Sequence, residues 1–193
     1  MKILTHVCCA PCFTYVHKKL KEEGNEVIGF WYNPNIHPFL EYRARLESLL
    51  RYQELENVEI IYKDEYNLKE FLKGQVNAED RCKFCYEHRL RETAKTSKEK
   101  GFEAFTTTLL ESPFQKHELI KEIGEKSGKE FGVKFYYEDF RAGHEQGKKL
   151  ASALSLYRQR YCGCIFSEHE RFGKRVGKML KEASVFNKSI EKL

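Results

Sequence analysis

The sequence contains no apolar run that approaches the ~20 residues needed to span a bilayer. It also lacks a signal peptide, because Met1-Lys2 leads directly into a strand-like segment that contains cysteines. These absences predict a cytoplasmic protein with no membrane partner. Stable disulfides are rare in the cytoplasm, so the seven cysteines are expected to be metal ligands or redox thiols rather than structural bridges.

No internal repeat, low-complexity tract or linker interrupts the chain, and neither sign of charge is in strong excess. The 193 residues are therefore expected to form a single domain with a core that needs no disulfides. Hydrophobic residues make up 41% of the chain and charged residues 33%, which is typical of a folded globular protein. The net charge of +5 permits a nucleic-acid partner but does not indicate one.

Short apolar runs alternate with helix-like segments. The runs predict strands at 3–7, 27–32, 58–62, 104–109 and 133–137. Helices are predicted at 13–23, 39–55, 66–72, 82–100 and 116–130, and residues 145–181 are predicted to be helical with a break around Cys162-Gly163-Cys164. In the helix at 39–55, the apolar positions include Leu40, Leu46 and Leu50.

Strands separated by helices predict an α/β protein with a parallel sheet covered on both faces. Right-handed crossovers then give a Rossmann-like (HUP-like) doubly wound sheet of about five strands, with a helical C-terminal extension. Ligands of such sheets bind outside the carboxyl ends of the strands. The segments that follow strands one, two, four and five are expected to line that edge, and they are Cys8–Cys12, Asn33–His37, Glu111–Gln115 and Asp139–Arg141.

Cys8-Cys9-Ala10-Pro11-Cys12 places three thiols within five residues, between a predicted strand and a predicted helix. Adjacent cysteines rarely pair with each other, because a vicinal disulfide strains the backbone. The unpaired N–H groups and the dipole at the start of a helix also stabilise thiolates. This stretch therefore predicts a metal or redox site at the end of the first strand.

Four more cysteines form two spaced pairs. Cys82-Lys83-Phe84-Cys85 is a CxxC that can bind one metal ion or cluster from a single helical turn, and with the first group it supplies the thiolates of a [4Fe–4S] cluster or a zinc site. A thioredoxin-like redox pair and small buried side chains are the alternatives for this CxxC. Cys162-Gly163-Cys164 either cycles between dithiol and disulfide or holds a second metal ion.

Five motifs together resemble the cobalamin-independent epoxyqueuosine reductases of the QueH type. In chain order they are CCAPC at 8–12, RCKFCY at 81–86, TTLLESP at 107–113, YYEDFR at 136–141 and LYRQRYCGC at 156–164. The resemblance runs from Met1 to about Ser167. One departure is Asp80, which stands where the family often has glycine before Arg81-Cys82.

The resemblance implies that the epoxide of epoxyqueuosine, on the wobble base of the tRNA anticodon loop, is reduced to the cyclopentene of queuosine in the last step of queuosine biosynthesis. It further implies an iron–sulfur enzyme with a [4Fe–4S] cluster, served by an unidentified electron donor. We assign the cluster ligands as Cys8, Cys9, Cys82 and Cys85. The thiols left beside the cluster, as a second iron site or a disulfide relay, are Cys12, Cys162 and Cys164. Which of the first three cysteines is not a cluster ligand stays open, since Cys9 and Cys12 also form a CxxC.

Several further residues are candidates for the reaction. Asp139 either binds the second metal ion or delivers a proton, and a helix N-cap is its alternative role. Tyr157 is a second candidate proton donor, with packing as its alternative role. The candidate catalytic residues are thus Cys162, Cys164, Asp139 and Tyr157.

For tRNA, the candidate phosphate contacts are Arg141, Arg158 and Arg160, and the candidate stacking residues are Trp31, Tyr32 and Phe114. Two other functions remain open from the sequence alone. These are a zinc-binding nucleic-acid module and a thiol–disulfide oxidoreductase.

Overall fold

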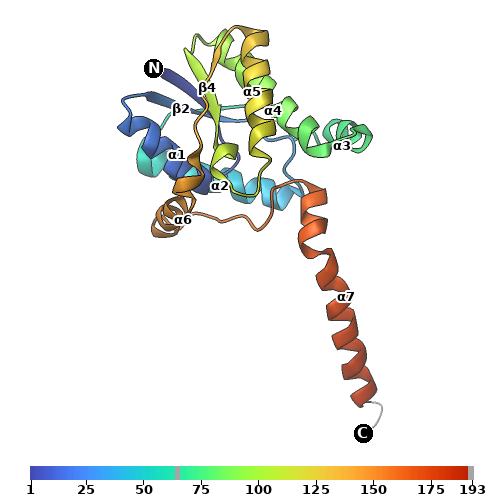
Figure 1. The fold of residues 1–193 in the computed structure, drawn as a ribbon. Helices are drawn as coiled ribbons and strands as arrows, with labels where there is room; N and C mark the ends of the chain where they lie inside the picture. Colours follow the sequence, from blue (N-terminus) through green and yellow to red (C-terminus); the bar gives the residue numbers. More distant parts are fainter. Residues whose placement is uncertain (64–65, 191–193) are drawn as a thin grey trace.

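The computed structural model describes residues 1–63 and 66–190 (Figure 1). Its strands are β1 (Lys2–His6), β2 (Glu26–Trp31), β3 (Ile60–Tyr62), β4 (Ala104–Thr107) and β5 (Lys134–Phe135). Its α-helices are α1 (Ala10–Glu22), α2 (Phe39–Glu56), α3 (Leu68–Asn77), α4 (Arg81–Glu99), α5 (His117–Phe131), α6 (His144–Ala153) and α7 (Ile165–Ile190). Two 3-10 helices are η1 (Thr108–Glu111) and η2 (Phe140–Gly143).

The five strands form one parallel sheet in the order β3-β2-β1-β4-β5. Connections run outward from β1 in one direction and outward from β4 in the other, so right-handed crossovers place their helices on opposite faces. Accordingly, α1 contacts α2 and α6, whereas α4 packs against α5 (Figure 1). The predicted doubly wound architecture is confirmed, and its switch point lies between β1 and β4.

The predicted strands all occur, but three are shorter than expected, and the run at 58–62 pairs only from Ile60 onward. The run at 104–109 leaves the sheet after Thr107 and continues as η1, and only Lys134 and Phe135 of the last run pair as strand. The predicted break near Cys162 is longer than expected, because residues 154–164 form an extended connection between α6 and α7. This connection crosses the switch point, so it shapes the site described below.

Helix α2 buries a different face from the one that Leu40 and Leu50 predict. Leu40 and Leu50 are 66% and 42% exposed, whereas Tyr42 and Arg45 are buried. Tyr42 accepts a hydrogen bond of 2.8 Å from the indole of Trp31, whose side chain is wholly buried. The stacking role expected for Trp31 is therefore wrong.

Helix α7 leaves the body of the protein at one end and runs away from it (Figure 1). Its first turns are held by Arg81, which forms an ion pair of 2.7 Å with Glu170 and lies over the ring of Phe166. Among the described residues, no helix combines the length and apolarity that crossing a bilayer requires.

His17 is a buried histidine on α1 whose ring stacks on Phe13 and whose Nδ1 lies 2.8 Å from the hydroxyl of Tyr52. Burial, with a smaller contribution from Lys21, lowers its pKa from 6.5 to about 4. The unfolded chain therefore takes up this proton first as the pH falls. The free energy of unfolding should drop by about 3 kcal/mol between pH 6.5 and pH 4 through this group alone.

The variant His17→Gln, which keeps a hydrogen-bonding amide beside Tyr52, should lose that part of the pH dependence. Urea unfolding at pH 7 and pH 4.5 measures it, with the exposed His169→Gln as the control. The same loss of stability on acidification in wild type and His17→Gln would contradict the assignment.

Candidate active site

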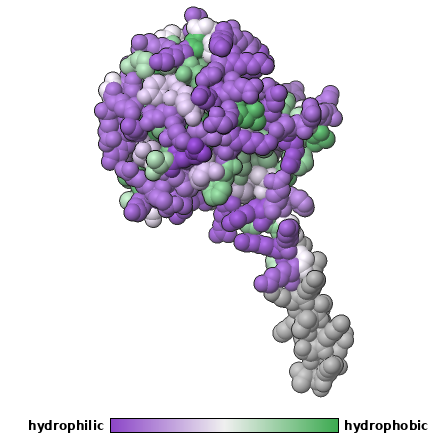
Figure 2. Space-filling view, in the orientation of Figure 1, coloured by the Kyte–Doolittle hydropathy of each residue, from purple (hydrophilic) through white to green (hydrophobic). Residues whose placement is uncertain are grey.

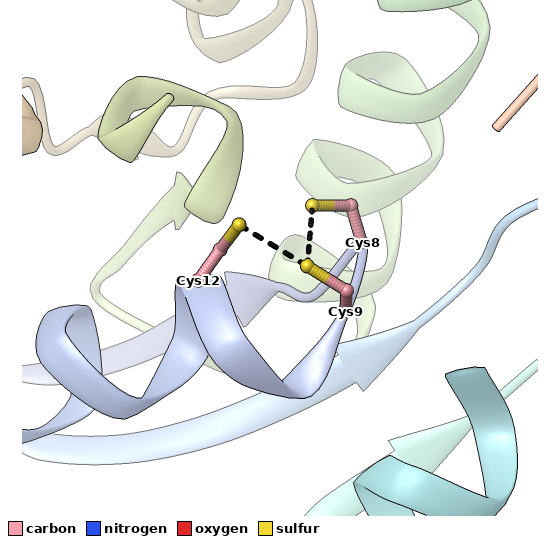
Figure 3. A group of neighbouring side chains, drawn as sticks. All are labelled: Cys8, Cys9 and Cys12. Carbon is pink, nitrogen blue, oxygen red and sulfur yellow. Dashed lines mark hydrogen bonds between the residues drawn. The ribbon is translucent and has the colours of Figure 1, made fainter. Parts of the chain in front are cut away.

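The three N-terminal thiols meet at the end of β1 (Figure 3). Cys9 is the N-cap of α1, and Cys12 lies in the first turn of that helix. The sulfur atoms are buried and lie within 4.8 Å of one another, with 3.8 Å from Cys8 to Cys9 and 3.1 Å from Cys9 to Cys12. Thiolates around a tetrahedral ion with bonds of ≈2.3 Å are about 3.8 Å apart. The triad therefore has the donors and the spacing to hold a metal ion or to supply ligands to a cluster.

One of these thiols ionises before the others. Hydrogen bonds from Cys12 and Cys9, and a further one of 3.2 Å from the hydroxyl of Thr108, lower the pKa of Cys8 well below its ordinary value. Burial raises the pKa of Cys9, and the hydrogen bond to Cys8 raises that of Cys12. The first negative charge of the triad is therefore held on Cys8.

Gln159 brings the C-terminal connection onto this triad. Its amide nitrogen lies 3.0 Å from the sulfur of Cys9 and 3.7 Å from that of Cys12. Sequence reasoning missed this residue, although it lies inside the motif at 156–164. Gln159 thus brings the motif at 156–164 into contact with the CCAPC motif at 8–12.

The second cysteine pair begins α4. Asp80 is the N-cap of this helix, and its carboxylate accepts hydrogen bonds from the backbone N–H groups of Cys82 and Lys83 at 2.8 and 3.2 Å. This capping gives the departure from glycine at position 80 a physical reason. Cys85 follows one turn later, and burial raises its pKa to about 12.

The third pair lies near the second. Burial is the largest cause of the raised pKa values of Cys82 and Cys85. The charges of Cys162 and Cys164 raise both pKa values further. The sulfur of Cys162 accepts a hydrogen bond of 3.5 Å from the amide of Gln115. All seven cysteines are free thiols, including Cys162 and Cys164.

Arg45 holds the connection that carries Cys162. Its guanidinium is 1% exposed and donates to the carbonyls of Tyr161 and Cys162 at 2.9 and 3.0 Å. Its third donor, Nε, forms an ion pair of 2.7 Å with Glu41. One buried side chain therefore ties α2 to the backbone of the CxC motif.

Gly163 is required by this arrangement. Its φ of +134° belongs to the region that side chains rarely adopt, and a Cβ atom there would lie 3.3 Å from Nη1 of Arg45. Its carbonyl accepts a hydrogen bond of 2.7 Å from the backbone N–H of His37. The glycine thus lets the motif pass close to Arg45.

Arg89 is a second buried arginine, on α4, but it has no carboxylate in reach among the described residues. It is 1% exposed, its Nε donates to the carbonyl of Cys85 at 3.3 Å, and its Nη2 has no hydrogen-bond partner in the part of the chain that the structure describes. Burial lowers the pKa of Arg89, but the charges of Cys85, Cys162 and Cys8 raise it above its ordinary value. Of these thiols, Cys8 is the one whose pKa is lowered, so its thiolate is the countercharge of Arg89.

A cavity of about 810 Å³ opens above these thiols. Three cysteines line it, namely Cys8, Cys12 and Cys162. The basic residues on its wall are Arg45, Lys148, Arg158, Arg160, Arg171 and Arg175. Phe114, which is 86% exposed, also lines it. A cavity that reaches thiols through a largely basic wall suits an anionic substrate.

Glu111 and His144 form a pair on the same wall, with 2.9 Å between the carboxylate and Nδ1. Glu111 is 2% exposed, its second oxygen has no partner among the described residues, and burial raises its pKa. Glu111 lay in a segment that the sequence placed at this edge, but nothing in the sequence predicted its pairing with His144.

A sequence model of the family "Epoxyqueuosine reductase QueH" matches residues 3–170, which is most of the chain. The chain belongs to the QueH family. A curated QueH protein from Dehalococcoides mccartyi is 41% identical over 174 residues, covering 90% of this chain and 96% of the relative. One from Thermotoga maritima is 36% identical over 182 residues, covering 88% of this chain and 91% of the relative. The resemblance in the five motifs is thus confirmed.

The fold of this QueH family member is similar to that of the U34-tRNA thiolase NcsA from Methanococcus maripaludis, solved with its [4Fe-4S] cluster. The TM-score is 0.59 at 18% identity, over 86% of this chain and 61% of the thiolase chain. At this identity the likeness shows the shared fold alone.

The remaining predicted residues of this QueH family member lie in different surroundings. Arg158 and Arg160 line the cavity, whereas Asp139 caps η2 and binds Arg141 at 2.5 Å. The hydrogen bonds from Arg141 lower the pKa of Asp139 to about 2. The hydroxyl of Tyr157 donates to Glu41 at 2.6 Å. Asp139, Arg141 and Tyr157 are not among the residues that line the cavity.

Proposed function

We propose that this chain reduces the epoxide of epoxyqueuosine in tRNA to the cyclopentene of queuosine. The observation that carries the proposal is the cavity of about 810 Å³, which joins a basic wall to cysteines from both ends of the chain. Membership in the QueH family supports the same reaction. The substrate's phosphates match the basic wall, and its wobble base is already unpaired, so little unstacking is needed before it enters.

The proposed cofactor is a [4Fe–4S] cluster on Cys8, Cys9, Cys82 and Cys85. All four are free thiols, and two of them, Cys8 and Cys9, belong to the triad whose sulfurs lie within 4.8 Å of one another, which supports this set. Cys82 and Cys85 would complete it from the first turns of α4. When bound, such a cluster supplies electrons one at a time from an external donor. Cys12, Cys162 and Cys164 remain beside it, as ligands of an additional iron ion or as a dithiol that forms a disulfide.

The reaction breaks both C–O bonds of the epoxide and consumes two electrons and two protons, with the oxygen leaving as water. The chain must therefore hold protons near the substrate. The Glu111–His144 pair is placed for this, because both residues line the cavity and share a hydrogen bond of 2.9 Å. Asp139 and Tyr157 stay candidate donors, at sites outside the cavity wall.

The basic and aromatic residues that line the cavity are the proposed contacts that position the tRNA. Arg158, Arg160 and Phe114 line the cavity. This supports phosphate binding by the two arginines and stacking of Phe114 on an unpaired base. The residues that hold the connection in place, Arg45 and Gly163, keep these arginines at the mouth of the cavity.

Anaerobic purification followed by iron, sulfide and visible absorption measurements tests the cofactor. The reaction is tested by incubating the protein with epoxyqueuosine-containing tRNA and dithionite, then analysing nucleosides by mass spectrometry. Queuosine should replace epoxyqueuosine. A colourless zinc protein would indicate a zinc-binding nucleic-acid module, and a metal-free protein whose CxxC exchanges with thioredoxin would indicate a thiol–disulfide oxidoreductase.

Arg89→Met should lower the reduction potential of the cluster, because it removes a buried positive charge that favours the more negative, reduced state. It should leave the apoprotein as stable as wild type or more so, since the guanidinium has no carboxylate partner among the described residues. Redox titration and urea unfolding measure the two effects.

The matched control is Arg91→Met, because Arg91 lies on the same helix with its charge on the surface, paired with Glu130. An unchanged potential in Arg89→Met would contradict the countercharge role.

A further inference from the structure

The net positive charge of this protein resides in one segment. Residues 171–193 hold seven of the 34 lysines and arginines but two of the 29 acidic residues. This difference equals the net charge of +5 of the whole chain, so residues 1–170 carry no net charge. The family model ends at the same place, at residue 170.

Four of these cations form a stripe on α7. Arg171, Lys174, Arg175 and Lys178 are spaced i, i+3, i+4 and i+7, so they share one face of the helix. All four side chains are exposed. Hydrophilic side chains cover α7 where it leaves the body (Figure 2).

The stripe starts at the mouth of the active-site cavity. Arg171 and Arg175 line the cavity together with Arg158 and Arg160 of the connection. Lys174 and Lys178 continue the same face outward along the helix. At ≈1.5 Å per residue, the part of α7 beyond Phe172 extends about 27 Å.

We propose that α7 is an RNA-binding arm, and that its basic face follows the phosphate backbone of the tRNA stem whose loop enters the cavity. The proposal rests on the proposed function, because the cavity fixes which end of the tRNA lies at the base of the arm. A closely spaced row of phosphates matches a row of cations on one face of a helix. The helix start is fixed to α4 through Arg81 and Glu170, so the arm has a defined origin.

The variant Lys174→Gln/Lys178→Gln tests the arm in the full-length, cluster-loaded protein. The probe is an unmodified tRNA transcript with guanine at the wobble position, and fluorescence anisotropy gives its dissociation constant over a range of KCl concentrations. The dissociation constant should rise on the order of tenfold, and the slope of log K against log salt should shrink by about 2. For the isolated anticodon stem-loop, which is shorter, the change should be smaller.

The control is Lys126→Gln/Lys129→Gln, which removes the same charge from exposed positions on α5. Its affinity and salt slope should equal those of wild type. A wild-type protein that reduces epoxyqueuosine while the α7 variant keeps wild-type affinity and slope would overturn the arm and leave the proposed function standing. A wild-type protein that binds tRNA through α7 without reducing epoxyqueuosine would overturn the proposed function instead.

Light scattering and flotation with anionic vesicles distinguish other uses of the helix. If the α7 variant converts a dimer to a monomer, or abolishes vesicle binding, without changing the salt slope for tRNA, the RNA-binding arm is refuted. The alternative partner is then a second copy of the chain or a lipid surface.

Discussion

Replacing Cys82 with alanine is expected to remove the proposed [4Fe–4S] cluster and to reduce epoxyqueuosine reduction to the background rate. Cys82 stands at the start of α4, where the capping of Asp80 fixes the first turn and orients the thiol pair. With one of four thiolates gone, the remaining three cannot bind all four irons through cysteine. Visible absorption, iron and sulfide content, and nucleoside analysis measure the loss.

The matched variant is Cys164→Ala, which removes a thiol from the motif assigned to the second iron or the disulfide relay. It should keep the colour and the acid-labile sulfide while turnover falls. Asp80→Asn, which keeps the capping oxygen, should retain both the cluster and activity. A brown, active Cys82→Ala protein would refute the ligand role of Cys82.

Arg45→Met is expected to destabilise the protein by about 3–5 kcal/mol, because it leaves Glu41 charged and buried without its partner. It also removes the two hydrogen bonds that hold the backbone of Tyr161 and Cys162. Chemical unfolding measures the stability. The rate of Cys162 alkylation in the folded apoprotein should rise, since the connection is released.

Two further variants make the result specific. Arg43→Met removes an exposed arginine from the same helix and should change the unfolding free energy by less than about 1 kcal/mol. The double variant Glu41→Leu/Arg45→Met removes both charges and should recover part of the stability while Cys162 stays reactive. Equal stability of Arg45→Met and Arg43→Met would rule out a buried clamp.

The sequence predicted the layers of the fold well, because a parallel sheet needs apolar strands and covering helices in regular alternation. It also placed Cys8–Cys12 and the segment after β4 at one edge, since that edge follows from topology. The other two cysteine pairs follow no strand, and only their ligand chemistry and the family resemblance joined them to this site. The sequence could not predict that α2 would bury Arg45 while exposing Leu40 and Leu50. The burial of Arg45 can be recognised only once the carbonyls that accept its hydrogen bonds are known, and these lie more than a hundred residues along the chain.

The same limit explains the other surprises. Trp31 lies within the strand predicted at 27–32, but only the packing of α2 over β2 shows that its ring is inside. The pairing of Glu111 with His144 joins two elements whose approach depends on α6 lying against α1. Local patterns thus singled out the cysteines that we propose carry the chemistry, while the residues that hold them in place emerged only from the tertiary structure.

The contact between Gln159 and Cys9 spans 150 positions of the chain. A ribosome that adds about 5–20 residues per second needs roughly 10–30 s to make that stretch. During synthesis, the N-terminal thiols therefore emerge long before the connection that contacts them. They also emerge before the cysteine pairs at 82/85 and 162/164. The four proposed cluster ligands, Cys8, Cys9, Cys82 and Cys85, are all made before this connection. The packing of Gln159 against the triad is consequently one of the last contacts that the growing chain can form.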